Sequence, residues 1–141
     1  MTLILDTGIL YAYYDARDLW HSQALQIIRD TSHELIIPSP VIAEVDHLLN
    51  SRRGFTAQVK FYQGMAEGYY QVSDLSRTGY GRVFELNQQY ADLRLGFVDA
   101  AVITIAEELG IGRIATTDRR HFGVVKAKIP LILLPELHTT P

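Results

Sequence analysis

Hydrophobic residues along this chain gather in short continuous runs, which are separated by longer segments of mixed polarity. The runs lack the alternation of polar and apolar positions that is typical of a strand with one solvent-exposed face. They therefore predict buried strands of a parallel sheet. We expect these strands at Thr2–Leu5, Glu34–Ile37, Tyr69–Val72, Arg113–Thr117 and Leu131–Leu134.

The longer segments carry apolar residues at helical spacing. They predict helices at Gly8–Tyr14, Asp18–Arg29, Pro40–Ser51, Phe55–Glu67, Leu75–Tyr90 and Phe97–Leu109. Asp18 is the expected cap of the second helix, with Leu19 as its first apolar position, and Ser39 is the expected cap before Pro40. Strands that alternate with helices predict an α/β fold, in which helices cover both faces of a parallel sheet of about five strands.

The composition is that of a single globular domain, which we expect to span residues 1–141, with 48% hydrophobic and 21% charged residues. The chain contains no cysteine, which excludes disulfides, thiolate nucleophiles and cysteine-ligated zinc or iron–sulfur centres. No apolar run approaches the roughly 18 residues of a membrane span, and the first residues lack the pattern of a signal peptide. We therefore expect a cytoplasmic protein with no membrane partner.

The formal net charge is -3, from 13 basic and 16 acidic residues. A protein that binds nucleic acid by bulk electrostatics is usually basic. Any contact with nucleic acid must therefore be local here, or helped by a bound cation.

Two aspartates stand where predicted strands end. Asp6 follows the first strand, and Asp118 follows the strand that ends at Thr117. In an open parallel sheet, ligands bind beyond the carboxyl ends of the strands, so both positions favour a functional role. The alternative is that each aspartate caps the helix or turn that follows it, which is a common structural use.

Two further acids lie on predicted helices. Asp99 falls within the apolar arc of its helix, where a carboxylate is costly unless it is paired, hydrogen-bonded or bound to a metal. The alternative is that Asp99 is itself the N-cap and the helix starts one residue later. Glu44 and Asp46 border opposite edges of an apolar arc, so helical phase does not choose between them, and either could be a solvated acid.

Asp6, Glu44, Asp99 and Asp118 come from four elements whose ends can share one edge of the sheet. Clustered carboxylates repel one another, and would take up protons unless a cation neutralised them. Oxygen ligands without His or Cys suit Mg²⁺ or Mn²⁺ better than Zn²⁺, and such a metal activates water and stabilises phosphoryl transition states. The other 12 acids and the 13 basic residues leave the rest of the chain at a formal charge of +1, so a phosphodiester substrate fits the charge balance.

Three motifs together resemble the PIN domain, and within that family the VapC-type ribonuclease toxins of toxin–antitoxin pairs. They are LILDTGILYAYYD at the start, PSPVIAEVDHLL in the first third and GFVDAAVITIAEELGIGRIATTDRRHF near the end. Their order and spacing cover most of the chain, whereas residues from about 52 to 90 match only as helix–strand–helix. The resemblance implies a three-layer α/β/α PIN-like domain.

On this resemblance, the acidic site of the family falls on Asp6, Glu44, Asp99 and Asp118, which selects Glu44 over Asp46. The implied activity is that of an endoribonuclease dependent on Mg²⁺ or Mn²⁺, in which one or two metals bind the scissile phosphate and lower the pKa of the attacking water. The resemblance also implies a homodimer, and a small cognate antitoxin that blocks the site.

Four residues within these motifs are the candidates for contacts with substrate or for support of the site: Thr7, Thr116, Arg119 and Arg120. Thr7 stands where the family has a small hydroxyl residue that helps to hold the metal site, and Thr116 matches its threonine before the last acid. Gly8 stands where serine is more frequent, a difference that we expect to cost little. Arg119 and Arg120 open a charged loop that is either solvated or holds RNA phosphates.

Other conspicuous residues have plainer interpretations. Asp92 lies where some relatives carry an acid, but a solvated loop residue is the favoured interpretation. Tyr11, Tyr13 and Tyr14 are expected to pack in the core and in an interface. Arg52 and Arg53 are weaker candidates for RNA contact. The histidines show no ligand spacing and are interpreted as structural or surface residues: His21, His33, His47, His121 and His138.

Three alternatives remain open at this stage. A phosphoacceptor receiver domain is also a small α/β fold with Mg²⁺, but it needs a pair of acids after the first strand and a lysine after the fifth, and the sequence has neither. A catalytically silent PIN-like scaffold is disfavoured by the complete set of four acids. A nuclease of the same fold that processes RNA cannot be separated from a toxin by sequence.

Overall fold

The computed structural model describes residues 1–136, which form one five-stranded parallel sheet with helices on both sides. The strands are β1 (Thr2–Leu5), β2 (Glu34–Pro38), β3 (Gln71–Ser73), β4 (Arg113–Ala115) and β5 (Ile132–Leu134). Their spatial order is β3-β2-β1-β4-β5, and every neighbouring pair is parallel. The predicted α/β class and the parallel sheet of five strands are confirmed.

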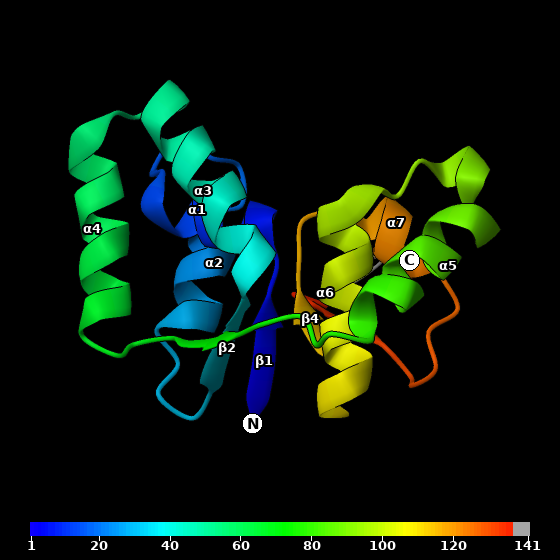
Figure 1. Cartoon of the computed structure of the whole chain (residues 1–141). Coiled ribbons are helices and arrows are strands. Elements are labelled where there is room, and N and C mark those ends of the chain that lie inside the picture. Colours follow the sequence, from blue (N-terminus) through cyan, green and yellow to red (C-terminus); the bar gives the residue numbers. More distant parts are fainter. Residues whose placement is uncertain (137–141) are drawn as a thin grey trace, which may run out of the picture.

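The helices of this part of the chain form two groups around the sheet. They are α1 (Thr7–Tyr14), α2 (His21–Ile28), α3 (Ser39–Arg52), α4 (Phe55–Ala66), α5 (Gly79–Gln89), α6 (Gly96–Leu109) and α7 (Arg119–Val124), with a short 3-10 helix η1 (Ala91–Leu93). In Figure 1, α1 to α4 lie on one side of β1, and α5 to α7 lie on the other. This is the three-layer arrangement that the alternation of elements predicts.

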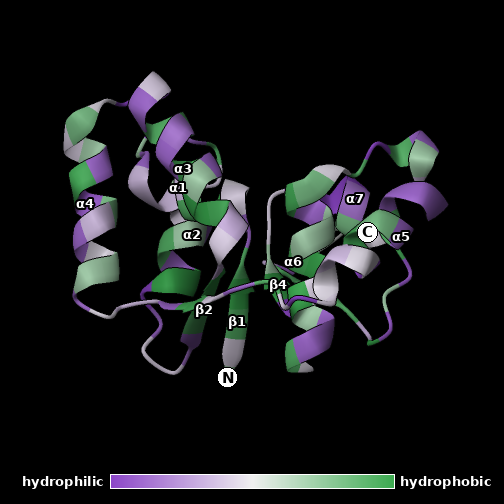
Figure 2. Cartoon of the chain, viewed as in Figure 1, coloured by the Kyte–Doolittle hydropathy of each residue, from purple (hydrophilic) through white to green (hydrophobic). Residues whose placement is uncertain are grey.

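The central strand and the helix α6 supply much of the core. Leu3, Ile4 and Leu5 of β1 are fully buried, and so are Ile103 and Ile105 of α6. Figure 2 shows β1 as hydrophobic over most of its length, with hydrophilic residues on the flanking helices. Full burial of one such aliphatic side chain contributes roughly 1.5–3 kcal/mol. The core therefore holds the end of β1, and whatever follows it, in a fixed place.

The strand order contains a point where the chain reverses direction across the sheet. From β1 the chain adds β2 and then β3 on one side, and it later returns to place β4 on the other side of β1. Ile4 pairs with Ile114, and the backbone N–H of Asp6 donates to the carbonyl of Ala115 at 2.9 Å. Ligands of open α/β sheets bind beyond the strand ends at such a point, so the ends of β1 and β4 mark the place for a site.

Two helices begin later than the sequence predicts. The helix expected from Asp18 begins at His21, because the Asp18 side chain accepts from the backbone N–H of Trp20 at 2.8 Å in the preceding turn. Leu19, the expected first apolar position, is 94% exposed. The helix expected from Leu75 begins at Gly79, where the Ser76 hydroxyl accepts from the Gly79 N–H at 3.1 Å. In both cases a side chain closes a turn in the place of a helical hydrogen bond.

Smaller boundary differences also have local causes. The helix α3 begins at Ser39 rather than after it, with Pro38 as the preceding residue, so Ser39 makes no capping hydrogen bond. The strand expected at Arg113–Thr117 ends at Ala115, because the side chain of Thr116 turns to other partners, described below. The predicted boundaries were wrong by one to four residues at these points, while the predicted elements exist.

A helix that the sequence did not predict, α7, replaces the charged loop expected after Asp118. Asp118 is its N-cap, and its Oδ1 accepts from the backbone N–H groups of Arg120 and His121 at 3.1 and 3.2 Å. Phe122 is the buried residue of this helix. Its six residues are too few to show a hydrophobic period, so the capping aspartate was the available signal.

Among residues 1–136, no helix combines the length and the apolar character that crossing a membrane requires.

Candidate active site

A cleft of about 390 Å³ opens at the carboxyl ends of β1 and β4. It is lined by the four acids, Asp6, Glu44, Asp99 and Asp118, and by Thr7, Gly8, Leu95, Gly96, Phe97, Val98 and Thr117. A larger hollow of about 640 Å³ lies elsewhere, beside α1, α2 and α4, with several tyrosines but a single carboxylate in its lining. We place the candidate active site in the smaller cleft, because the acids converge there.

Asp6 is the most deeply buried of these acids, with 3% of its surface exposed. Its Oδ2 accepts from the Thr116 hydroxyl at 2.8 Å, whereas its Oδ1 is buried and has no hydrogen-bond partner among residues 1–136. Burial and, next, the charge of Asp99 raise the pKa of Asp6 to about 7. An ionised Asp6 therefore needs a positive partner at Oδ1.

Asp99 lies in the first turn of α6, with a side chain that is 17% exposed. The helix begins at Gly96 and not after Asp99, so the alternative that Asp99 is the N-cap is excluded. Its Oδ2 accepts from Nδ1 of His121 at 2.5 Å. Burial raises the pKa of Asp99, and the hydrogen bond from His121 opposes that rise.

Asp118 and Asp6 are linked through Thr116. The Thr116 hydroxyl donates to Asp6 and accepts from the backbone N–H of Asp118 at 2.9 Å. Thr116 is fully buried, so it positions the two acids and offers no surface to a substrate, in contrast to the contact we expected from the sequence. The free Oδ2 of Asp118 lies 3.2 Å from Nδ1 of His121.

The structure separates Glu44 from Asp46, which helical phase could not do. Glu44 is exposed and lines the cleft. Asp46 faces α4, where its Oδ1 accepts from the side chain of Gln58 at 2.9 Å and from the Tyr62 hydroxyl. Asp46 thus joins α3 to α4, and Glu44 is the acid that α3 presents to the cleft.

Thr7 and Gly8 begin α1 at the floor of the cleft. Thr7 is 7% exposed, and its hydroxyl has no hydrogen-bond partner among residues 1–136. A Cβ on Gly8 would lie 2.0 Å from Oγ1 of Thr117. The glycine therefore leaves room for Thr117, a cleft residue, and a serine in its place would require Thr117 to move.

Arg119 and Arg120 point to different surroundings. The guanidinium of Arg119 lies 5.8 Å from the centre of the Trp20 ring and donates to the carbonyl of Pro135, so it is committed to packing. Desolvation lowers the pKa of Arg119. Arg120 is exposed. Of the two, Arg120 is the one free to meet a phosphate from solvent.

Sequence reasoning missed His121. Its Nδ1 contacts both Asp99 and Asp118, and these three residues can offer ligand atoms within 4.8 Å of one another. The signal was the spacing Asp-x-x-His: when an aspartate caps a helix, the residue three positions later lies over the cap. A search for histidines spaced from each other could not find this arrangement.

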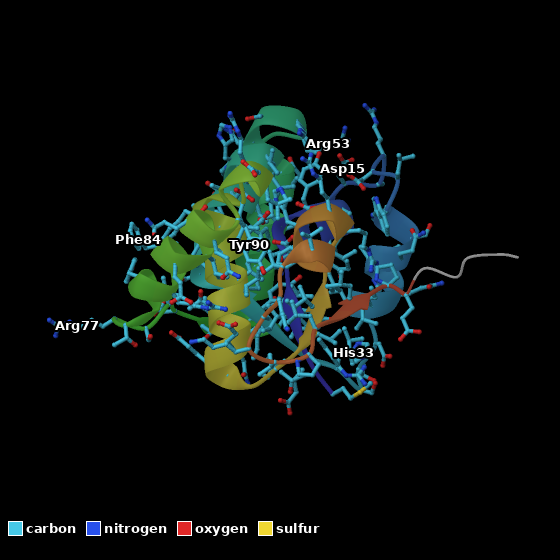
Figure 3. All side chains as sticks on the ribbon, turned by 90° about the vertical axis from the view of Figure 1, so that its right-hand side faces the viewer. Asp15, His33, Arg53, Arg77, Phe84 and Tyr90 are labelled. Atoms are coloured by element: carbon cyan, nitrogen blue, oxygen red, sulfur yellow. The ribbon has the colours of Figure 1, made fainter. Side chains whose placement is uncertain are left out.

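The other conspicuous side chains lie outside the cleft. Asp92 is exposed in η1, and Tyr11 is in the core, as expected. Figure 3 shows Asp15 beside Arg53, whose Nε is 3.5 Å from Oδ1 of Asp15, while Arg52 lies 5.3 Å from the centre of the Tyr11 ring. These contacts make Arg52 and Arg53 part of the packing of α1 against α3.

The remaining histidines are bound to backbone carbonyls or lie on the surface. Nδ1 of His21 is 2.7 Å from the carbonyl of Ala12, and Nδ1 of His33 is 3.0 Å from that of Ile27. His47 is exposed, and His138 lies outside the described residues.

The donor set fits a hard divalent cation. Four carboxylates line the cleft, and among residues 1–136 the ligand atoms that lie within 4.8 Å of one another come from Asp99, Asp118 and His121. Oδ1 of Asp6 and the Thr7 hydroxyl are buried and lack hydrogen-bond partners among these residues, and the pKa of Asp6 is raised. Oxygen ligands of this kind suit Mg²⁺ or Mn²⁺. His121 adds one nitrogen beside Asp99 and Asp118, although its contact with Asp99 also suits the role of an orienting partner.

Comparison with known proteins places this geometry in a family. The model of the PIN domain matches residues 3–128. Ribonuclease VapC26 of Mycobacterium tuberculosis is 29% identical over 124 residues, which cover 88% of this chain and 92% of that protein. The crystal structure of VapC20 of the same species, a toxin that cleaves the sarcin–ricin loop, has a TM-score of 0.73 at 21% identity, covering 79% of this chain and 86% of that one.

A second solved structure extends over nearly the whole chain. The VapBC2 structure from Rickettsia felis, bound to a DNA fragment from its promoter, has a TM-score of 0.66 at 19% identity and covers 94% of this chain and 97% of the other. These similarities show the fold, and the family model covers β2, β3, β4, most of β1 and the four acids of the cleft. The chain belongs to the PIN domain family.

Proposed function

We propose that this protein is a metal-dependent endoribonuclease and the toxin of a toxin–antitoxin pair. The observation that carries the proposal is the convergence of Asp6, Glu44, Asp99 and Asp118, from four elements, on one cleft at the switch point of the sheet. The similarity to ribonuclease VapC26 and to VapC20 supports RNA as the substrate.

The residues of the cleft have two proposed roles: some would bind the metal, and others position those ligands. Asp6 through its unpartnered Oδ1, together with Asp99, Asp118 and Glu44, would hold Mg²⁺ or Mn²⁺. The metal would supply Lewis-acid stabilisation of charge on the phosphate and an activated water. The assignment of each acid to the metal stays a prediction.

The positioning residues form hydrogen bonds to the acids. Thr116 fixes the carboxylate of Asp6 and the backbone of Asp118 with one hydroxyl, so the ends of β1 and β4 keep one geometry. His121 holds Oδ2 of Asp99. Such partners fix the direction of a ligand before the metal binds, which lowers the cost of assembling the site.

Arg120 is the proposed contact for an RNA phosphate at the rim of the cleft, because it is exposed and lies two residues after Asp118. A single arginine supplies a local positive charge in a chain whose formal net charge is -3. It would position the RNA backbone without reading its sequence.

The decisive experiment is RNA cleavage in the presence and absence of metal. We expect cleavage to vanish in excess chelator and to return when Mg²⁺ or Mn²⁺ is added, whereas the surface variant Asp92→Asn should behave as the parent. An Asp99→Asn protein purified in parallel controls for contaminating ribonuclease. If the parent cleaves RNA in excess chelator and this variant does not, the proposed chemistry is contradicted.

We further propose a homodimer, and a small protein antitoxin that blocks the cleft. The similarity to VapBC2 and to the FitAcB structure from Neisseria gonorrhoeae, with a TM-score of 0.64 over 92% of this chain, supports such a partner. Light scattering of the purified protein tests the dimer. Co-expression with the product of a small neighbouring gene, followed by purification and a cleavage assay, tests the antitoxin.

A further inference from the structure

One wall of the cleft is an aromatic ring that remains open to solvent. Phe97 lines the cleft two residues before Asp99, in the first turn of α6, and it is 48% exposed. Gly96, which precedes it, has a φ of 83°, is also exposed, and has no side chain of its own to cover the ring. A large apolar ring at the mouth of a cleft lined by four carboxylates is not explained by the acids.

A second ring extends this surface away from the acids. Tyr80, in the first turn of α5, stacks on Phe97 with ring centres 6.3 Å apart and an angle of 25° between the planes. Tyr80 is 58% exposed, and Phe84, one turn further along α5, is 65% exposed. Figure 3 shows Phe84 pointing away from the body of the protein.

Much of the packing of α5 is made by residues other than these rings. Val83 and Leu86 are the buried side chains of this helix, and its Arg82 pairs with Glu107 of α6 at 2.9 Å. These contacts hold α5 against α6, while Tyr80 and Phe84 stay more than half exposed. The exposed aromatic surface is therefore available for a ligand.

We propose that Phe97 and Tyr80 form a stacking platform for an unpaired base next to the phosphodiester in the cleft. The inference rests on the proposed function and names the two residues that would hold a nucleotide beside the reacting phosphate. A base in a duplex is already stacked and cannot lie against protein rings, whereas an unpaired base exposes its face. The acids act on the phosphate, and the rings select which nucleotides reach it.

The position of Phe97 favours a base over a second copy of the chain. The ring is shared between the cleft and the aromatic surface, so a ligand on it is continuous with a ligand among the acids. A second copy seated on Phe97 in the active enzyme would cover the mouth through which the phosphodiester must enter. A nucleotide next to the reacting one would fill the same surface and leave the phosphate in place.

The test measures RNA binding in excess chelator, where no cleavage interferes. The probes are a short single-stranded RNA that carries 2-aminopurine and its duplex with a complementary strand. Loss of one stacked base lowers affinity about five- to a hundred-fold. We expect a decrease of that size for Phe97→Ala, a decrease for Tyr80→Ala, and near-parental affinity for Phe97→Trp. The parent should bind the duplex more weakly and should change the 2-aminopurine fluorescence of the single strand.

Phe55→Ala is the matched control, because Phe55 is 73% exposed at the start of α4 and does not line the cleft. Circular dichroism verifies that each variant is folded. If Phe97→Ala and Phe55→Ala bind the single strand equally well, the platform is wrong. The same conclusion follows if Phe97→Ala and Tyr80→Ala leave RNA affinity unchanged but halve the mass measured by light scattering, since the surface then joins two copies.

The binding assay also separates this inference from the proposed activity. A protein that binds single-stranded RNA through Phe97 but never cleaves it would overturn the nuclease and leave the platform standing. If the parent cleaves RNA with a metal, and the variants without these rings bind RNA as tightly as the parent, the nuclease stands and the platform is wrong.

Discussion

Replacing Asp6 by asparagine should change the stability of the metal-free protein by an amount that increasingly favours the variant as the pH rises. In the folded protein the pKa of Asp6 is about 7, against a value of 3.8 for an unperturbed aspartate, because the carboxyl is buried near Asp99. Between these two values the folded state keeps a proton that the unfolded state has lost. The free energy of unfolding of the parent therefore falls as the pH rises from about 4 to about 7, in the absence of metal.

The magnitude follows from the shift. One pKa unit corresponds to about 1.4 kcal/mol, so the whole rise is worth about 4 kcal/mol above pH 7 and about 1.5 kcal/mol at pH 5. Asparagine carries no charge at either pH and can keep the hydrogen bond from Thr116, but its buried amide adds a constant penalty of about 1–3 kcal/mol. The difference in stability between Asp6→Asn and the parent should therefore shift by about 3 kcal/mol in favour of the variant between pH 5 and pH 8.

Urea unfolding of both proteins at pH 5, 6.5 and 8 in chelator measures this difference, with Asp92→Asn as a surface control. Added Mg²⁺ should then stabilise the parent at pH 8 and have little effect on Asp6→Asn, since a ligand stabilises only the state that binds it. A variant that is less stable than the parent by the same amount at every pH would refute the reasoning, because Asp6 would then be a structural hydrogen-bond partner and not a desolvated acid.

Three further variants test other parts of the site. Asp99→Asn should abolish RNA cleavage and most of the rise in melting temperature that Mg²⁺ gives the parent; an active variant that responds equally to Mg²⁺ would contradict its assignment. Asp118→Ala should lose about 1 kcal/mol of stability with the cap of α7, whereas Asp118→Asn should keep that stability in thermal melts and still lose cleavage. Arg120→Ala should weaken RNA binding and flatten its dependence on salt, while Arg119→Ala should mainly lower the melting temperature; equal effects on binding would show that both arginines meet phosphates.

Much of the fold could be predicted from local patterns. Apolar runs such as Leu3–Leu5 identify buried strands because a parallel sheet covered on both faces needs apolar residues at every position. Boundaries were harder, as Asp18 and Ser76 show, because a side chain that closes a turn competes with the first helical hydrogen bond, and sequence does not say which prevails. The helix α7 was not predicted, because its six residues are too few to show a helical hydrophobic period.

The acids of the cleft were identified from the sequence, yet their individual roles depend on tertiary contacts. The position of Asp6 after a buried strand and of Asp99 on an apolar arc are local facts, because chain geometry alone makes a carboxylate there costly. Other features depend on how separate elements pack. Oδ1 of Asp6 has no partner among residues 1–136, Thr116 contacts two acids while fully buried, and Asp46 faces α4.

The same division explains His121, Arg119 and Phe97. Composition and spacing report which chemical groups a chain possesses and on which face of an element each one lies, since these follow from covalent geometry and helical or strand period. Which groups meet depends on how the elements pack. Packing brought His121 to Asp99, took Arg119 to Trp20, and left the ring of Phe97 open beside the acids. The sequence by itself thus determined the kind of site, and the tertiary structure decided which side chains belong to it, because desolvation and hydrogen bonding act only between groups that the fold has brought into contact.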